Sequence, residues 1–258
     1  MALADGDPVL DIGRVVQRTF QVLGRNIVPF LGLAVVLVGL PSVVIGLFNV
    51  APAATVSPLS IENVLGGFAS LIVKLLLSVF LQACIVVASV AELRGQRLSM
   101  IDTLKQTAAF ILPASAITIL ASLGIGFAML LLVVPGMILA TMWAVVIPAE
   151  VIEKTGISGA FRRSRDLTRG NRWRIFALYM VFGIVAIVLD WSLLRMLGFS
   201  LTPAAGANAA LSIPALVMSG AIGVVTSLVG SIGAASIYFE LRAVGEGVDI
   251  DDLASIFA

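Results

Sequence analysis

Six long apolar segments constrain the fold of this chain more than any other feature of its sequence. A helix needs about 20 consecutive, mostly apolar residues to cross the hydrocarbon core of a bilayer, and each segment meets that length. The segments are Ile27–Phe48, Leu65–Ala91, Phe110–Leu130, Val134–Ile152, Arg174–Leu197 and Ser212–Leu241, with a turn expected near Pro135 between the third and the fourth. We therefore predict an all-α integral membrane fold, a six-transmembrane helical bundle forming a single membrane domain over residues 1–258.

The composition excludes most soluble and catalytic classes. Only 12% of the residues are charged and the mean hydropathy is +1.11, whereas an average soluble domain is about a quarter charged. The chain has no histidine, and Cys84 is its single cysteine, so histidine-based metal or acid–base sites and an internal disulfide are excluded. No phosphate-binding Gly-Lys loop, nucleophile elbow or paired intramembrane carboxylates occur. We therefore expect no enzymatic activity, no metal and no cofactor.

The basic residues predict the orientation of the chain. Fourteen of the 16 Lys and Arg residues fall before the first segment, between the second and third, around the loop between the fourth and fifth, or after the sixth. The positive-inside rule places these regions, and therefore both termini, in the cytoplasm. The first 26 residues lack the short apolar region and cleavage site of a signal peptide. We therefore expect Ile27–Phe48 to remain as a membrane span.

Three segments on the predicted cytoplasmic side are amphipathic, at about residues 8–25, 99–109 and 157–171. Each immediately precedes an odd-numbered span. The first is expected to begin at Asp7, an N-cap residue, with Pro8 at the first helical position. Helices of this kind lie flat in the headgroup region. The pattern also fits a threefold internal duplication, but residue-by-residue matching is poor, so flat connecting helices are the favoured interpretation.

The segment 154–174 is strongly basic. It carries seven Lys or Arg residues and one acid, Asp166. Such a cluster attracts anionic lipid by about 1 kcal/mol per basic residue, although orientation in the membrane is the favoured explanation of these charges. The segment is short and adjoins a bilayer, so we expect no nucleic acid to bind. The expected partners are the bilayer and its anionic headgroups on the cytoplasmic side, and a membrane-protein partner or a homo-oligomer is left open.

Arg163 departs from this simple lipid-facing pattern. At 100° per residue it falls beside Leu167, at the edge of the apolar face of its helix. An arginine at that position needs a specific partner. We predict that it pairs with one of three carboxylates at the inner ends of spans and so docks the flat helix onto the bundle: Glu150, Glu153 or Glu240.

The same region carries a family resemblance. The residues concerned are Ala160, Arg163, Ser164, Leu167, Thr168, Gly170, Trp173 and Arg174, preceded by Pro148 and Glu153. This pattern resembles the hallmark segment of the glycerophosphoryl diester phosphodiesterase membrane-domain family, except that Arg165-Asp166 stands where an aromatic residue is expected. The resemblance implies a multi-pass protein of the bacterial inner membrane, of uncharacterised role. It does not imply the enzyme activity, since the catalytic domain and its histidines have no counterpart here.

Two ionisable residues lie well inside predicted spans. Lys74 and Asp190 are each roughly 10–14 Å from the outer ends of their helices at 1.5 Å rise per residue. Intramembrane charges are candidates for function. The two side chains could form a pair that holds two helices together, which we favour, or line a polar cavity.

The sixth segment has a small residue at every fourth position. This helix-packing stripe consists of Ser219, Gly223, Ser227, Ser231 and Ala235. Small residues let helices approach closely in lipid. The stripe predicts a packing seam within the bundle, and a dimer face or a sliding surface is an alternative.

These features lead to two candidate functions. The first is a membrane-organising or accessory protein whose basic cytoplasmic face contacts lipid or a partner. The alternative is a small transporter or lipid-handling protein with a polar cavity near Lys74 and Asp190. We favour the first, because polar residues inside the spans are few and ion-coupled carriers usually have more.

Overall fold

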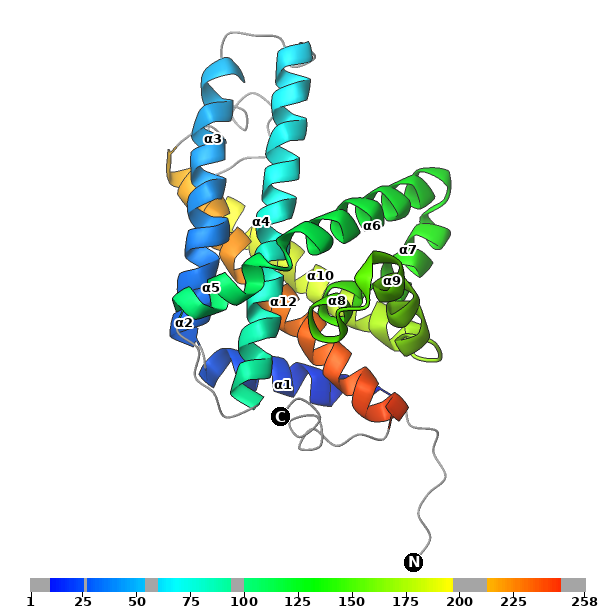
Figure 1. Ribbon diagram of the computed structural model, residues 1–258. Helices are drawn as coiled ribbons and strands as arrows, with labels where there is room; N and C mark the ends of the chain where they lie inside the picture. The colour runs from blue at the N-terminus through cyan, green and yellow to red at the C-terminus, as the bar shows by residue number, and fades with distance from the viewer. Residues whose placement is uncertain (1–9, 26, 54–59, 94–99, 197–212, 247–258) are drawn as a thin grey trace, which may run out of the picture.

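The structure, a computed structural model, describes residues 10–25, 27–53, 60–93, 100–196 and 213–246 (Figure 1). Every regular element in these ranges is a helix, which confirms the all-α prediction. Five helical segments are long and apolar enough to cross a membrane: Ile27–Phe48, Val64–Val90, Ile111–Leu131, Val133–Glu153 and Leu216–Gly245. They coincide with five of the six predicted spans to within a few residues.

The first amphipathic helix, α1 (Ile12–Arg25), begins later than predicted. Asp11 caps its N-terminus, and Asp7, the predicted cap residue, lies outside the described residues. The Asp11 Oδ1 atom accepts hydrogen bonds from the backbone N–H groups of Gly13 at 2.8 Å and Arg14 at 3.2 Å. These bonds satisfy donors that the first turn of a helix leaves unpaired. The predicted start at Pro8 lies outside the described residues, whereas Leu10 and Asp11 precede the helix that the structure describes.

The first span contains a widened turn at its centre. It comprises α2 (Ile27–Ala34), a π-helical turn (Val35–Gly39) and α3 (Leu40–Ala53). The Leu40 N–H donates to the Val35 carbonyl, five residues back. Pro41 supplies the reason, because proline has no N–H and its ring collides with the carbonyl four residues earlier in a regular helix.

The second and third predicted spans follow as α4 (Ile61–Leu93) and α6 (Ile111–Leu131), with the short helix α5 (Met100–Ala108) between them. Figure 1 shows α3 and α4 standing side by side, while α6 and α7 (Val133–Met142) form a hairpin that leans away from them. The α6–α7 turn is a single extended residue, Leu132, and not the predicted turn at Pro135. Pro135 lies in the first turn of α7, where a missing N–H has no consequence.

A glycine permits this tight hairpin. A Cβ atom added at Gly136 would lie only 2.9 Å from the backbone N and Cα of Met129 on α6. Any side chain at position 136 would therefore force α6 and α7 apart.

The fourth predicted span is interrupted. It consists of α7 and α8 (Val146–Glu153), separated by a turn over residues 143–145. Pro148 accounts for the interruption, because its ring would collide with the Ala144 carbonyl in a continuous helix. The turn is closed by bonds over three residues instead of four, including one from Val146 N–H to the Trp143 carbonyl. The Met142 carbonyl thereby loses the helical donor it would otherwise have.

The remaining elements are α9 (Gly156–Leu167), α10 (Arg172–Met196) and α12 (Ile213–Glu246). The axes of α9 and of α10 up to Val188 differ by 98°. In Figure 1, α12 runs obliquely across the bundle, and it packs against α1, α3, α4 and α10. Three of its side chains, Ile237, Tyr238 and Leu241, are among the most completely buried of the protein.

The contact between α12 and the first span uses glycines, although only part of the predicted stripe takes part. A Cβ at Gly220 would lie 3.2 Å from the Gly39 carbonyl oxygen, and one at Gly223 would lie 3.7 Å from Val38. Ser231 and Ala235 are buried and Ser227 is half-buried, whereas Ser219 is exposed. The seam follows Gly220, because α12 turns its Ser219 side away from α3.

Candidate functional site

The α9 helix is docked on the bundle by one buried face. Four residues of the predicted motif are on it: Ala160, Ser164, Leu167 and Thr168. The Ser164 hydroxyl donates to the Met142 carbonyl at 2.9 Å, and the Thr168 hydroxyl is 3.4 Å from the same oxygen. This is the carbonyl that the break before α8 leaves without a helical donor. The two hydroxyls therefore satisfy a buried acceptor that would otherwise destabilise the fold.

The predicted ion pair of Arg163 is present. Its Nε atom donates to Glu153 Oε1 at 2.8 Å, and the Tyr238 hydroxyl donates to the same oxygen at 2.7 Å. One carboxylate thus joins α8, α9 and α12. Glu150, another of the three predicted candidates, is buried, and its Oε2 atom has no hydrogen-bond partner among the described residues.

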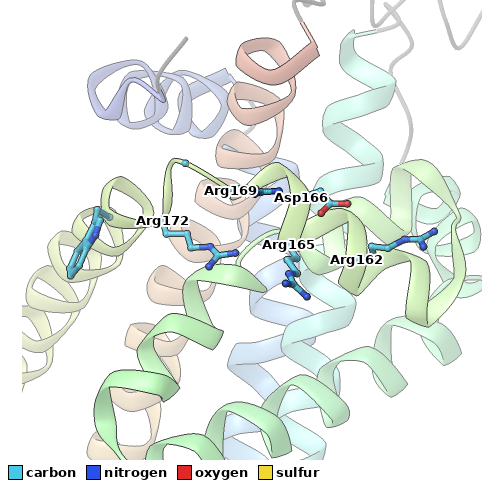
Figure 2. Close-up of a pocket in the computed structure, with 7 residues that line it drawn as sticks. Arg162, Arg165, Asp166, Arg169 and Arg172 are labelled. Atoms are coloured by element: carbon cyan, nitrogen blue, oxygen red, sulfur yellow. The ribbon is translucent and has the colours of Figure 1, made fainter. Parts of the chain in front are cut away.

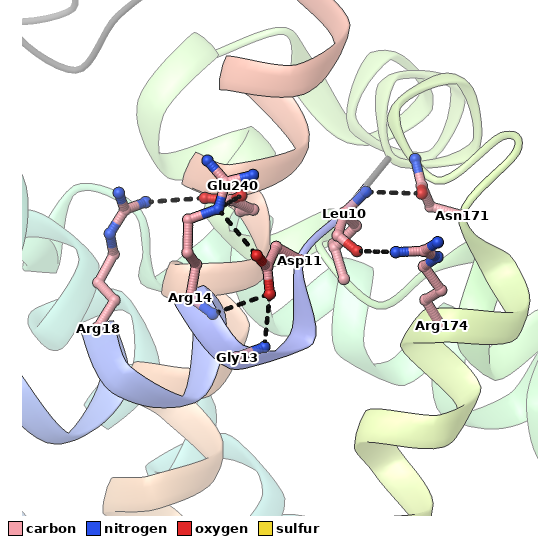
Figure 3. Close-up of polar contacts among 8 residues, drawn as sticks. All are labelled: Leu10, Asp11, Gly13, Arg14, Arg18, Asn171, Arg174 and Glu240. Carbon is pink, nitrogen blue, oxygen red and sulfur yellow. Dashed lines mark hydrogen bonds and ion pairs between the residues drawn. The ribbon is translucent and has the colours of Figure 1, made fainter. Parts of the chain in front are cut away.

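The third candidate, Glu240, is held by α1. Its side chain is buried, with Arg14 Nε 3.2 Å and Arg18 Nη1 3.6 Å from the carboxylate oxygens (Figure 3). These contacts of Arg14 and Arg18 with Glu240 were not predicted from the sequence. The Glu240 carboxylate itself indicated that such a contact exists, because a buried acid at the inner end of an apolar span needs a cation beside it.

Two further contacts join Leu10, which lies just before α1, to the start of α10. The Leu10 N–H donates to Asn171 Oδ1 at 3.0 Å, and Arg174 Nη1 donates to the Leu10 carbonyl at 2.7 Å (Figure 3). The turn that precedes Asn171 requires Gly170, whose φ of +86° is unfavourable for other residues. Arg174 and Gly170 of the predicted motif therefore have structural roles.

The fold lowers the pKa of Asp11, which lies beside this cluster and outside the spans. The backbone N–H of Arg14 is the main cause that lowers the pKa of the Asp11 carboxyl below its usual value, with the N–H of Gly13 and the Arg14 charge acting in the same direction. Hydrogen bonds to the ionised form stabilise it. The cap on α1 therefore stays charged at neutral pH.

The structure divides the basic residues of the segment 154–174 into two groups. Three are used within the protein: Arg163 on Glu153, Arg174 on Leu10, and Lys154, whose Nζ lies 5.5 Å from the centre of the Phe110 ring. The other four are Arg162, Arg165, Arg169 and Arg172.

These four arginines line one open hollow of about 600 Å³ at the corner between α9 and α10, together with Asp166, Gly170 and Trp173 (Figure 2). None of the four guanidinium groups forms an ion pair within the described part of the chain. The Arg172 Nε atom is buried there without a hydrogen-bond partner. Trp173, at the same hollow, is 84% exposed. We call these four arginines and Trp173 the basic corner.

The predicted intramembrane pair of Lys74 and Asp190 lies partly outside the described residues. Lys74 is exposed on α4. Asp190 belongs to α10, but its side chain lies outside the described residues, so the pair stays a prediction. Arg195 stacks on Trp191, with 6.0 Å between the guanidinium carbon and the ring centre. Over the ranges that the structure describes, no three His, Cys, Asp or Glu residues are grouped closely enough to hold a metal ion.

Comparison with known proteins gives one match. The model of a domain of unknown function, DUF7847, matches residues 98–239, which is more than half of the chain and includes α9, the basic corner and the Arg163–Glu153 pair. No curated protein and no solved structure matches the chain. The resemblance to the glycerophosphoryl diester phosphodiesterase membrane domain stays a prediction. By the extent of the matched region, the chain belongs to the DUF7847 family.

Proposed function

We propose that this chain is a six-span protein of the bacterial inner membrane with both termini in the cytoplasm, and that its basic corner contacts anionic lipid headgroups in an accessory, membrane-organising role. The observation that carries the proposal is the division of the arginines. Orientation of the chain needs only positive charge on one side. It does not require four guanidinium groups that have no ion-pair partner in the described ranges to gather at one corner beside an exposed tryptophan.

The strength of this attraction follows from the number of charges. Each basic residue near an anionic surface contributes about 1 kcal/mol, so four contribute about 4 kcal/mol at low salt. Tryptophan is enriched at the headgroup level of membrane proteins, because its ring is apolar and its N–H is polar. Trp173 therefore marks the depth at which the corner meets the bilayer.

The sixth span in this proposal is α10. Its 25 residues correspond to about 37 Å of helix, which exceeds the thickness of a hydrocarbon core. Flat α9 and spanning α10 also account for the 98° angle between them. The alternative is that α9 and α10 together form one broken span.

Labelling of introduced cysteines tests this topology. Replacing Cys84 by serine leaves the chain without cysteine, so single cysteines can be placed at Arg165 and at Ala205. A membrane-impermeant maleimide is expected to label Ala205→Cys in intact cells and Arg165→Cys only after the membrane is permeabilised. Labelling of both positions from the same side would show that α10 does not cross.

Fluorescence quenching tests the lipid contact. In the double variant Trp143→Phe/Trp191→Phe, Trp173 is the only tryptophan. In vesicles, brominated phosphatidylglycerol is expected to quench it more than brominated phosphatidylcholine at the same mole fraction. Changing the four arginines of the basic corner to glutamine should abolish this difference. Equal quenching by the two lipids before those changes would refute the proposed function.

A further inference from the structure

The basic corner has features that a flat, uniformly charged surface does not need. Its cations come from two helices, with Arg162, Arg165 and Arg169 on α9 and Arg172 at the start of α10. Because the helix axes differ by 98°, these side chains surround a common space. Figure 2 shows Arg165 and Arg172 pointing to the same side of the corner from the two helices.

The hollow is also of a size and charge suited to a discrete anion. Its volume of about 600 Å³ lies within the roughly 300–1,000 Å³ typical of small-molecule sites. Its walls carry four arginines against the single Asp166, so three positive charges are uncompensated by lining residues. The Arg172 Nε atom, next to the hollow, is a buried N–H donor without an acceptor in the described structure, and an unpaired buried donor costs free energy.

The four arginines favour a phosphomonoester over a phosphodiester as the bound group. A phosphodiester, as in phosphatidylglycerol, carries one negative charge shared by two free oxygens. A phosphomonoester carries between one and two charges at neutral pH and presents three terminal oxygens. Arginine pairs with phosphate through two parallel hydrogen bonds, and two arginines on different sides can bind different oxygens of the same group.

We propose that the basic corner is a binding site for a phosphomonoester group, with Arg165 and Arg172 as its principal ligands. This inference rests on the proposed function and makes it more specific, since a lipid with a terminal phosphate would occupy the hollow in preference to other anionic lipids. The same group on a free, soluble phosphate compound has the same chemistry. Competition by soluble phosphate compounds separates these two sources.

The test is a titration of the purified full-length chain in neutral detergent, followed by native mass spectrometry. The ligands are dioctanoyl forms of phosphatidic acid, phosphatidylglycerol and phosphatidylcholine. One added charge-assisted hydrogen-bond pair corresponds to about a tenfold change in affinity. Phosphatidic acid is therefore expected to bind about tenfold more tightly than phosphatidylglycerol. Inorganic phosphate and glycerol phosphate are then added as competitors. If these soluble compounds displace phosphatidic acid at similar concentration, the site is assigned to soluble phosphomonoesters. If they do not displace it, the site is assigned to the lipid.

Two variants separate geometry from charge. Arg165→Gln/Arg172→Gln is expected to remove the preference for phosphatidic acid. Arg165→Lys/Arg172→Lys keeps the charge but lacks the two-pronged hydrogen bonding, and should lose most of the preference as well. The matched control is Arg25→Gln/Lys105→Gln, which removes two exposed charges from other helices and should behave as the wild type.

The outcomes distinguish this inference from the proposed function. Equal affinity for phosphatidic acid and phosphatidylglycerol, with both above phosphatidylcholine, would overturn the phosphomonoester site and leave the general lipid contact intact. A preference that persists in Arg165→Gln/Arg172→Gln would also overturn the site. Equal binding of all three lipids would overturn both.

Discussion

Substitution of Arg163 by glutamine should weaken the docking of α9 on the bundle. The change removes the 2.8 Å hydrogen bond to Glu153 and leaves that carboxylate with the Tyr238 hydroxyl. The Arg163 and Glu153 side chains are 27% and 16% exposed, which places the pair between a surface ion pair of about 0.2–1 kcal/mol and a buried one whose disruption costs about 3–5 kcal/mol. A loss of about 2 kcal/mol in the free energy of docking is therefore expected.

Hydrogen exchange of the α9 backbone amides measures this loss directly. Since 1.4 kcal/mol corresponds to a factor of ten, a loss of about 2 kcal/mol should speed exchange across α9 about thirtyfold, with little change in α4. The matched control is Arg162→Gln, which removes the same charge from the neighbouring, exposed position and should leave exchange unchanged. If the two variants exchange at the same rate, the ion pair does not hold α9 and the reasoning fails.

Three further predictions follow from the geometry of the helices. Gly136→Ala should lower the melting temperature, because a Cβ there meets the backbone of the facing helix and overpacking costs about 1–3 kcal/mol. The control Gly126→Ala has open space around it and should not lower the melting temperature. Equal melting temperatures of the two variants would contradict the close approach of α6 and α7. Ser164→Ala should lower the free energy of unfolding by about 1–2 kcal/mol in a detergent unfolding titration, because the Met142 carbonyl loses the closer of its two hydroxyl donors. An unchanged free energy of unfolding would mean that another donor replaces the Ser164 hydroxyl. Because the pKa of Asp11 is lowered in the folded state, the stabilisation by its cap on α1 is fully present above the usual carboxyl pKa and is lost as the pH falls through the lowered pKa. The amide resonances in the first turn of α1 should therefore shift below the usual carboxyl pKa and not between pH 5 and 8.

The apolar segments were predictable because their signal is local. A run of about 20 apolar residues specifies a spanning helix whatever its neighbours are, and α4, α6 and α12 begin and end within about five residues of the predicted spans. The interruption between α7 and α8 was also present in the sequence, at Pro148. It was not predicted, because a proline inside an apolar run can either kink a helix or break it, and the surrounding contacts determine which occurs.

The candidate site was predictable only in part. The position of Arg163 on its helix was enough to predict an acidic partner, and Glu153 fills that role. The partners of Glu240 were not predicted, since nothing in the local sequence shows that Arg14 and Arg18, more than 200 residues away, lie beside it.

The sequence by itself determined the all-helical architecture and the accumulation of positive charge in one segment, because both follow from residue composition over short stretches. The tertiary structure decided which of those charges remain free. Arg163 and Arg174 meet acceptors supplied by α8 and by the chain before α1. Arg165 and Arg172 meet no acceptor among the residues that the structure describes, and they line a common hollow. The physical reason is that an ion pair depends on two side chains meeting in space, and helix packing brings together residues that the sequence keeps far apart.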